Sequence, residues 1–470
     1  MPESLPPVQY LGRPAFRKIT LLPLLAATYL MVAGGPYGLE DLVKNTGYGW
    51  AIVVLLLVPL IWSLPTALMV SELSSAMPEE GGYYVWVRRA MGPFWGFQEA
   101  WLSLAASIFD MAIYPVLFVA YLGFLCHEPK LAKDYPALLM LVGGGVIVVC
   151  VFANIRGARL VGGSSLLMLV ALLGPFVVLI VVAFGNQPVS AEEAPSAEID
   201  FVAGFLVAMF NYMGWDNAST IAGEVDRPQR TYPLALGGAL LLVVLTYTLP
   251  VLAAARTGID PASWDEGTWV DVGDKVAGSG LRAAIAIGGM IAFLGMFNSL
   301  VLSYSRVPYA LAKDGYLPAV FTRRHPTTGA PWVAILACAV AWALALQLSF
   351  RRLVALDVIL YGMSLILEFV ALVVLRIREP QLARPFRVPG GMIGAVVVGL
   401  GPTLLIGAAI FDQSFKWELE GDDPMAPAVA LLLGIALAAL GPVVYFVSLP
   451  WRRKAVPVAM AGSFDSSLRT

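Results

Sequence analysis

Val32-Ala33-Gly34-Gly35-Pro36-Tyr37-Gly38 is a run of three glycines and one proline inside a hydrophobic stretch that covers residues 17–43. Each glycine disfavours an α-helix by about 1 kcal/mol and an interior proline by about 3 kcal/mol. At mid-membrane depth, irregular backbone persists only where it lines a cavity or is buried in protein. The run therefore predicts a membrane-spanning helix that is broken at a site inside the protein.

The composition supports a membrane protein. Hydrophobic residues make up 59% of the 470 residues and charged residues 13%, whereas ordinary globular proteins have about 45–50% and about 25%. A soluble domain cannot bury this much apolar surface, so the excess must face lipid. The net charge of −2 gives no bulk attraction to nucleic acid. We therefore expect an all-α polytopic membrane protein in contact with the lipid bilayer, with no nucleic-acid partner.

Histidine and cysteine usage bears on chemistry. The two histidines, His127 and His325, lie in polar stretches, and the cysteines Cys126, Cys150 and Cys338 are far apart in the sequence. This pattern predicts no metal site, no cofactor and no nucleophile–base pair, so an enzyme is not expected. A channel would usually show a repeated pore motif, which this sequence lacks. Residues 1–15 have no apolar core, so no cleavable signal peptide is expected.

Hydropathy predicts twelve spans of about 20 residues each. They lie near residues 17–43, 47–71, 93–123, 136–154, 160–184, 201–225, 232–255, 277–306, 332–349, 353–375, 393–411 and 427–449. With the N-terminus in the cytoplasm, 21 of the 30 basic residues fall on the cytoplasmic side. The positive-inside rule then predicts that both termini are cytoplasmic, in a multi-pass protein of the cytoplasmic (inner) membrane.

A second interruption occurs in the sixth span, at Asn211-Tyr212-Met213-Gly214-Trp215-Asp216-Asn217. The two interruptions are five spans apart, so the broken helices enter the membrane from opposite sides. Paired broken helices of opposite direction point to an inverted-repeat secondary transporter with its binding site between the breaks. The alternative is that both are packing kinks, which glycine and proline permit in any membrane helix.

Charged residues inside the spans indicate a polar pathway, because charge at mid-bilayer is costly. The third span carries polar residues at helical spacing, so that Glu99, Ser103, Asp110 and Tyr114 share one face. Asp110 is expected to face the substrate, with a structural hydrogen bond as the alternative. For Glu99, about 16 Å from Asp110 along the helix, a structural role is the better interpretation.

Other candidates surround the two breaks. Asp216 either binds a cation or caps a new helix start, and Glu368 in the tenth span either carries a proton or pairs with a base. Aromatic residues near the breaks form packing, a gate or a cation–π site. The predicted substrate site comprises Gly34, Gly35, Tyr37, Asp110, Tyr114, Phe210, Tyr212, Gly214, Trp215 and Asp216. The predicted proton-coupling carboxylates are Asp110, Asp216 and Glu368.

Several motifs resemble one family along residues 17–450. They are Gly34-Gly35-Pro36-Tyr37-Gly38 with Glu40-Asp41, Pro78-Glu79-Glu80-Gly81-Gly82-Tyr83, Gly92-Pro93-Phe94-Trp95-Gly96-Phe97, Ala222-Gly223-Glu224-Val225, Ala312-Lys313-Asp314-Gly315-Tyr316-Leu317-Pro318 and Arg384-Pro385-Phe386-Arg387-Val388-Pro389. In these the chain resembles the amino acid–polyamine–organocation (APC) transporters. Two further segments, residues 109–115 and 361–369, look most like the polyamine-uptake branch, next to the L-type amino acid permeases.

The resemblance implies a LeuT-like fold of twelve transmembrane helices, with a five-plus-five inverted repeat and broken first and sixth helices. It places the first repeat at residues 17–184, the second at 201–377 and two further spans at 393–449, between cytoplasmic tails at 1–16 and 450–470. It also implies alternating access coupled to an ion gradient. Symport and exchange both remain open.

The charges at the two helix breaks bear on the class of substrate. A broken helix offers carbonyls to a cation and amides to a carboxylate, and an amino acid uses both. A polyamine uses only the carbonyls and needs carboxylates, which Asp110, Asp216, Glu40 or Glu368 could supply. Leu300 stands where the polyamine branch tends to have an acid, which counts against long polyamines. The expected substrate is a polyamine or related cationic amine, and an amino acid is the alternative.

The coupling ion is expected to be a proton rather than sodium. Some members of the resembled family place a lysine in the fifth span in place of sodium, and residues 160–184 contain none. A sodium site would use first-span carbonyls with the hydroxyls of Ser299 and Ser303. A proton needs only a buried carboxylate, and this chain has several candidates.

Overall fold

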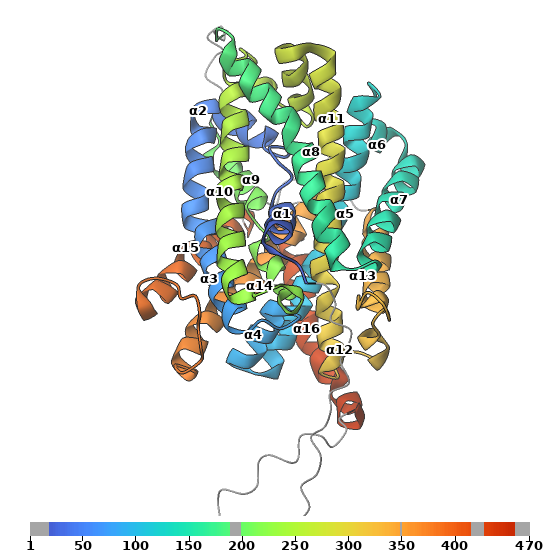
Figure 1. Cartoon of the computed structure of the whole chain (residues 1–470), viewed down its shortest axis with the longest axis vertical. Coiled ribbons are helices and arrows are strands. Elements are labelled where there is room, and N and C mark those ends of the chain that lie inside the picture. The colour runs from blue at the N-terminus through green and yellow to red at the C-terminus, as the bar shows by residue number, and fades with distance from the viewer. Residues whose placement is uncertain (1–17, 189–198, 348–349, 415–426, 456–470) are drawn as a thin grey trace, which may run out of the picture.

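The computed structural model describes residues 18–188, 199–347, 350–414 and 427–455. Within these ranges the regular structure is helical, apart from three isolated β-bridges (Figure 1). Nine of the described helices are long and apolar enough to cross a membrane. Leucine and valine side chains such as Leu141, Val148 and Leu404 are mostly exposed on the outside of the bundle, as a lipid-facing surface requires.

Each of the twelve predicted spans overlaps a helix of the structure. In chain order these helices are α1 (Leu21–Val32), α2 (Glu40–Val58) continued by η1 (Pro59–Ser63) and α3 (Leu64–Ala76), α5 (Pro93–Leu125), α7 (Pro136–Ile155), α8 (Ala158–Gly185), α9 (Phe201–Asn211) with η2 (Trp215–Thr220) and η3 (Ala222–Glu224), α10 (Pro228–Ala254), α11 (Thr268–Tyr304), α13 (Trp332–Ala345), α14 (Phe350–Arg378), α15 (Gly391–Ser414) and α16 (Pro427–Ala455). Short helices connect them: α4 (Gly82–Met91), α6 (Leu131–Asp134), η4 (Pro261–Ser263), α12 (Arg306–Lys313) and η5 (Ala319–Thr322).

The break in the first span is confirmed. Helix α1 ends at Val32 and the next helix begins only at Glu40. Between them Gly35 has a φ of 77° and Gly38 a φ of 90°, values that side chains other than glycine rarely adopt. Gly47, with a φ of 69°, marks the point inside α2 where the first span ends and the second begins.

The sixth span is also broken, and its break lies against that of the first span. Helix α9 ends at Asn211, and beyond Gly214 the chain continues as the 3-10 helix η2. The Asn211 side chain donates a hydrogen bond to the Gly38 carbonyl at 3.0 Å. A Cβ on Gly214 would lie 2.5 Å from the Met31 carbonyl oxygen, so only glycine permits this contact.

The short segment before each broken span hydrogen-bonds to the other broken span; we call these two the exchanged segments. Before α1, Ile19 donates its N–H to the Glu224 carbonyl at 2.9 Å and accepts from the Asp226 N–H at 2.9 Å. Before α9, Asp200 donates its N–H to the Asn45 carbonyl at 3.0 Å. The segment that precedes each broken span is therefore bound to the end of the other.

The eighth span differs from its prediction at its outer end. Helix α11 begins at Thr268, nine residues before the predicted start at residue 277, and it contains two non-helical residues, Ala277 and Gly278. The positive φ of Gly278, 72°, lets the chain turn there. Residues 268–276 therefore form an additional helical segment, and the predicted span corresponds to the part after the kink.

Helix α5 lies at the centre of the packing that positions the site. It packs against α11 on one side and against α14 on another. Helix α1 packs against α8, α10 and α11, and it lies near the middle of the bundle in Figure 1. The breaks and the polar faces of α5 and α14 are thus enclosed by protein.

Candidate substrate-binding site

Two polar helix faces oppose each other in the bundle. The face of α5 predicted from the sequence is matched by one on α14, whose polar members recur at helical spacing. The acids are eleven positions apart on both helices, from 99 to 110 and from 357 to 368, which is about 16 Å along a helix axis. The α14 face consists of Asp357, Tyr361, Ser364 and Glu368, all buried.

Asp110 is held by two tyrosines from different helices. Tyr114 donates to Asp110 Oδ1 at 2.5 Å, and Tyr304 on α11 donates to Oδ2 at 2.9 Å. The side-chain amide of Asn217 in turn contacts the Tyr304 hydroxyl at 3.4 Å. The structure thus brings the predicted residues Asp110 and Tyr114 together and connects them to the sixth-span break.

Asp216 is buried next to the second break. Tyr361 donates its hydroxyl proton to Asp216 Oδ1 at 2.5 Å and accepts the Gly214 N–H at 2.9 Å. Tyr361 therefore satisfies the Gly214 amide, while the backbone N–H groups of Asp216 and Asn217 interact with the Asp216 carboxyl itself. This interaction is that of a cap at the start of η2, the alternative role expected for Asp216.

Asp357 is a third buried aspartate, which the sequence analysis missed. It comes from α14 and lies within electrostatic range of Asp110 and Asp216. The described residues provide no ion pair to any of these three aspartates, and the buried ion pair of Arg376 with Glu72 lies elsewhere. We call Asp110, Asp216 and Asp357 the aspartate cluster. Its helical spacing from Glu368 was the signal that could have revealed Asp357.

Glu99 and Glu368 form a second acidic group, the glutamate pair. Both are fully buried. Ser103 donates to Glu99 Oε1 at 2.8 Å, while Glu99 Oε2 and both oxygens of Glu368 have no hydrogen-bond partner in the described part of the chain. Glu368 therefore does not pair with a base there. Its electrostatic neighbours are Asp216 and Glu99.

The first break is partly satisfied by the protein's own carboxylate. Glu40 accepts the Gly38 N–H at 2.7 Å and the Tyr121 hydroxyl at 3.0 Å. At the predicted site residues Gly34 and Gly35, the absence of a side chain lets the backbone lie close to neighbouring helices. A Cβ on Gly34 would lie 2.8 Å from Met296 Sδ, and one on Gly35 would lie 2.9 Å from Leu172 Cδ1.

The predicted aromatic residues fall into two groups. Tyr37 and Tyr212 are bound to backbone carbonyls away from the aspartates, since Tyr37 donates to Ile285 at 2.6 Å and Tyr212 to Leu55 at 2.9 Å. Trp215, next to Asp216, is fully buried and its Nε1 has no partner among the described residues. Phe210 is half-buried at the end of α9. Among the predicted aromatic residues, Tyr114 is therefore the one that contacts the aspartate cluster directly, through its hydrogen bond to Asp110.

The hydroxyls considered for sodium are already engaged. Ser299 shares a hydrogen bond with Ser165 of α8 at 3.0 Å, and Ser303 donates to the Asn217 carbonyl at 2.8 Å. Over the residues that the structure describes, no three His, Cys, Asp or Glu side chains come together as metal ligands. The aspartates therefore interact electrostatically without being close enough to share one metal ion.

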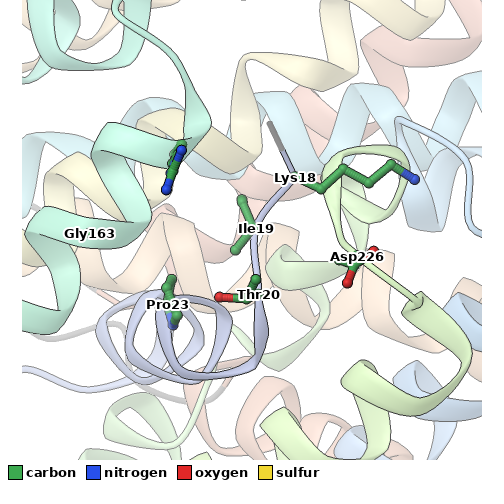
Figure 2. A pocket seen from close by; sticks show the side chains of 7 residues that line it. Lys18, Ile19, Thr20, Pro23, Gly163 and Asp226 are labelled. Carbon is green, nitrogen blue, oxygen red and sulfur yellow. The ribbon is translucent and has the colours of Figure 1, made fainter. Parts of the chain in front are cut away.

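A cavity of about 550 Å³ lies beside the first exchanged segment. Figure 2 shows Ile19 between Gly163 and Asp226 in this cavity. Asp110, Asp216 and Asp357 do not line it, so it is separate from the candidate site. Its lining residues are Lys18, Ile19, Thr20, Pro23, Arg159, Gly163 and Asp226.

Comparison with known proteins identifies the family. Residues 24–419 match the family model described as amino acid permease. The polyamine transporter RMV1 of Arabidopsis thaliana is 36% identical over 428 residues, 90% of this chain and 84% of that protein. The polyamine transporter PUT1 of Oryza sativa subsp. japonica is 35% identical over 402 residues, 85% and 75% of the two chains.

A more distant relative is the serine/threonine exchanger SteT of Bacillus subtilis, 24% identical over 385 residues, 80% of this chain and 84% of that protein. The family and the relatives named here are transporters and not enzymes. With its helical, membrane-spanning fold and its two broken spans, the chain belongs to the amino acid permease family of the amino acid–polyamine–organocation superfamily, and it is a secondary transporter.

Proposed function

We propose that this transporter carries polyamines or related linear amines, and that the aspartate cluster binds their ammonium groups. The observation that carries the proposal is the convergence of three buried carboxylates from α5, η2 and α14, with no basic side chain paired to them within the described ranges. Buried charges need partners. A ligand with two or more positive charges provides them, and the names of the relatives in Arabidopsis and rice point the same way.

The backbone amides at the breaks favour an amine over an amino acid. An amino acid must place its carboxylate on free amides at a broken helix. Here Glu40 occupies the Gly38 N–H and Tyr361 occupies the Gly214 N–H. A substrate carboxylate would also be repelled by Asp110, Asp216 and Asp357. A neutral or cationic amino acid, the alternative substrate, is therefore disfavoured at this site.

We further propose that residues 17–184 and 201–377 are inverted repeats that move by alternating access. The reciprocal pairing of Ile19 with Glu224 and of Asp200 with Asn45 supports this division. Proton coupling is proposed over sodium because carboxylates are plentiful in the site while Ser299 and Ser303 are engaged by protein groups. The distribution of basic residues supports a place in the cytoplasmic membrane with both termini inside.

The test is uptake of labelled putrescine and labelled alanine into proteoliposomes by wild type and by three variants, Asp110→Asn, Asp216→Asn and Asp357→Asn. Each substitution keeps the size of the side chain and removes its charge. A charge-assisted contact is worth about 1.5–3 kcal/mol, so each variant should bind putrescine about ten- to a hundredfold more weakly. Asp357→Asn is the most telling variant, because the described residues give the Asp357 side chain no hydrogen bond of the kind that a structural role would need.

The matched control is Asp271→Asn, which makes the same change at an exposed residue that pairs with Arg282. It should leave putrescine uptake at the wild-type level. Wild-type putrescine affinity in all three cluster variants, or a wild type that prefers alanine, would reject the amine assignment and favour an amino acid.

A further inference from the structure

The glutamate pair lies apart from the aspartate cluster on the same two helices. Glu99 and Asp110 are three helical turns apart on α5, and so are Glu368 and Asp357 on α14. Because α5 and α14 are predicted to run in opposite directions across the membrane and pack together, Asp110 faces the level of Asp357 while Glu99 faces the level of Glu368. The acids therefore form two tiers, with Asp216 in electrostatic contact with both.

The surroundings of the glutamate pair leave its charge uncompensated. The groups that face it are Tyr83 on α4, Ser103 on α5, Tyr361 on α14 and Asp216 on η2. None of them is a base. Three of the four carboxylate oxygens are buried without any hydrogen-bond partner in the described part of the protein. Two unpaired negative charges in such a place would be very costly, so a cation must accompany them.

The size of that cation is limited by the packing. Glu99 and Glu368 are 0% exposed, so no space for an ammonium group adjoins them. A metal ion needs several converging ligands, and the described chain provides no such group of acids. A proton needs no cavity, and two neighbouring carboxyls can hold one between them.

We propose that Glu99 and Glu368 share a single proton, and that an amine bound at Asp216 displaces it, which makes the glutamate pair the coupling-ion site. This inference rests on the proposed amine transport. The coupling follows from Asp216, which interacts with both glutamates. A positive charge that arrives at Asp216 repels the shared proton, and by linkage the proton weakens amine binding to the same extent.

The experiment is isothermal titration calorimetry of purified full-length protein with putrescine at pH 7, in two buffers with different ionisation enthalpies. The difference in heat gives the number of protons released per amine bound. Wild type should release about one proton, as expected for two carboxyls that share one. Glu99→Gln and Glu368→Gln should release almost none, while their putrescine affinity stays within about threefold of wild type.

Two controls accompany these variants. Glu379→Gln makes the same change outside the spans, where hydrogen bonds from Arg89 hold the pKa of the Glu379 carboxyl below its ordinary value, so that it has no proton to release at pH 7. This control should behave as wild type. Glu368→Asp keeps a carboxyl and should retain proton release, which shows that a variant without release has lost an acid and not its fold.

The outcomes separate this inference from the proposed function. A wild type that binds no putrescine contradicts the proposed function itself. A wild type that binds putrescine without releasing a proton overturns the inference alone. Proton release that persists unchanged in both Glu99→Gln and Glu368→Gln also overturns it, because the proton would then come from the aspartate cluster.

Discussion

Two fully buried glutamates, Glu72 and Glu368, have opposite environments. Glu72 is fully buried and accepts hydrogen bonds from Arg376 Nε at 2.9 Å and from the Val388 N–H at 2.7 Å, with Arg384 close by. Glu368 is equally buried, yet neither of its oxygens has a partner in the described residues. The first carboxylate binds the loop after α14 to α3, whereas the second has no such structural contact and its burial is costly.

Replacement of each glutamate by methionine should therefore have effects of opposite sign. Glu368→Met removes an unpaired polar group, so we expect unchanged or higher stability, by up to about 4 kcal/mol. Glu72→Met leaves two arginines without their partner and should cost about 3–5 kcal/mol. Thermal unfolding of both purified variants measures the difference. If Glu368→Met unfolds as early as Glu72→Met, then Glu368 has a structural role.

The exchanged segments are the features that matter at the scale of elements. Ile19 connects the start of α1 to the end of the sixth span through two backbone hydrogen bonds. The cavity in Figure 2 lies directly beside this connection and includes Gly163 of α8. Movement of α1 away from Glu224 would therefore expose Gly162, the buried neighbour of Gly163 on α8. A cysteine at Gly162 is a reporter of that movement, because its Cβ would lie 3.0 Å from Pro23 Cβ and 3.7 Å from Ile19 Cγ2.

Ile19→Pro should increase maleimide labelling of a Gly162→Cys reporter. Proline removes the N–H that binds the Glu224 carbonyl, which is worth about 0.5–1.5 kcal/mol, so the rate should rise by up to about tenfold. The reporter is made in a Cys126→Ser background, which removes the exposed native cysteine. The other two cysteines, Cys150 and Cys338, are buried and should not react. Leu21→Pro is the matched control, since proline is tolerated at the first position of a helix. Equal rates in the two proline variants would show that the Ile19 pairing does not hold α1.

At the scale of the whole molecule, the charges predict how the protein lies in the membrane. The proposed orientation places the loop between α5 and α7 on the outer side, and this loop contains Cys126, the exposed cysteine of the described chain. A membrane-impermeant maleimide should therefore label wild type in intact cells and leave Cys126→Ser unlabelled. Labelling that requires permeabilised cells would reverse the orientation and place both termini outside.

The sequence predicted the large features because they depend on local properties. The breaks at residues 32–38 and 211–217 follow from glycine and proline, and the spans follow from continuous hydropathy. The outer part of α11 was missed because residues 268–276 are too polar to be recognised as part of a span. The close approach of Gly214 to Met31 depends on two distant segments, which no local pattern encodes.

The site was only partly predictable for the same reason. Asp110 and Asp216 were identified as candidates because each interrupts an apolar stretch. Asp357 was missed because it lies near the start of the tenth span, where an acidic residue is usually interpreted as part of a polar helix end. The role of Glu99 depends on its neighbour Glu368, and their proximity comes from the packing of α5 against α14. The assignments of Tyr37 and Tyr212 to the site stay predictions.

Glu40 gives the proposed preference for amines a simple chemical basis. Its carboxylate stands on the Gly38 amide, the kind of group that would otherwise receive the acid end of an amino acid. The Glu40 side chain thus supplies the carboxylate that an amine substrate lacks. A carrier with such a built-in acid needs nothing from its cargo except positive charge. Under the proposed amine transport, removal of this one carboxylate would free the Gly38 amide for the acid end of an amino acid.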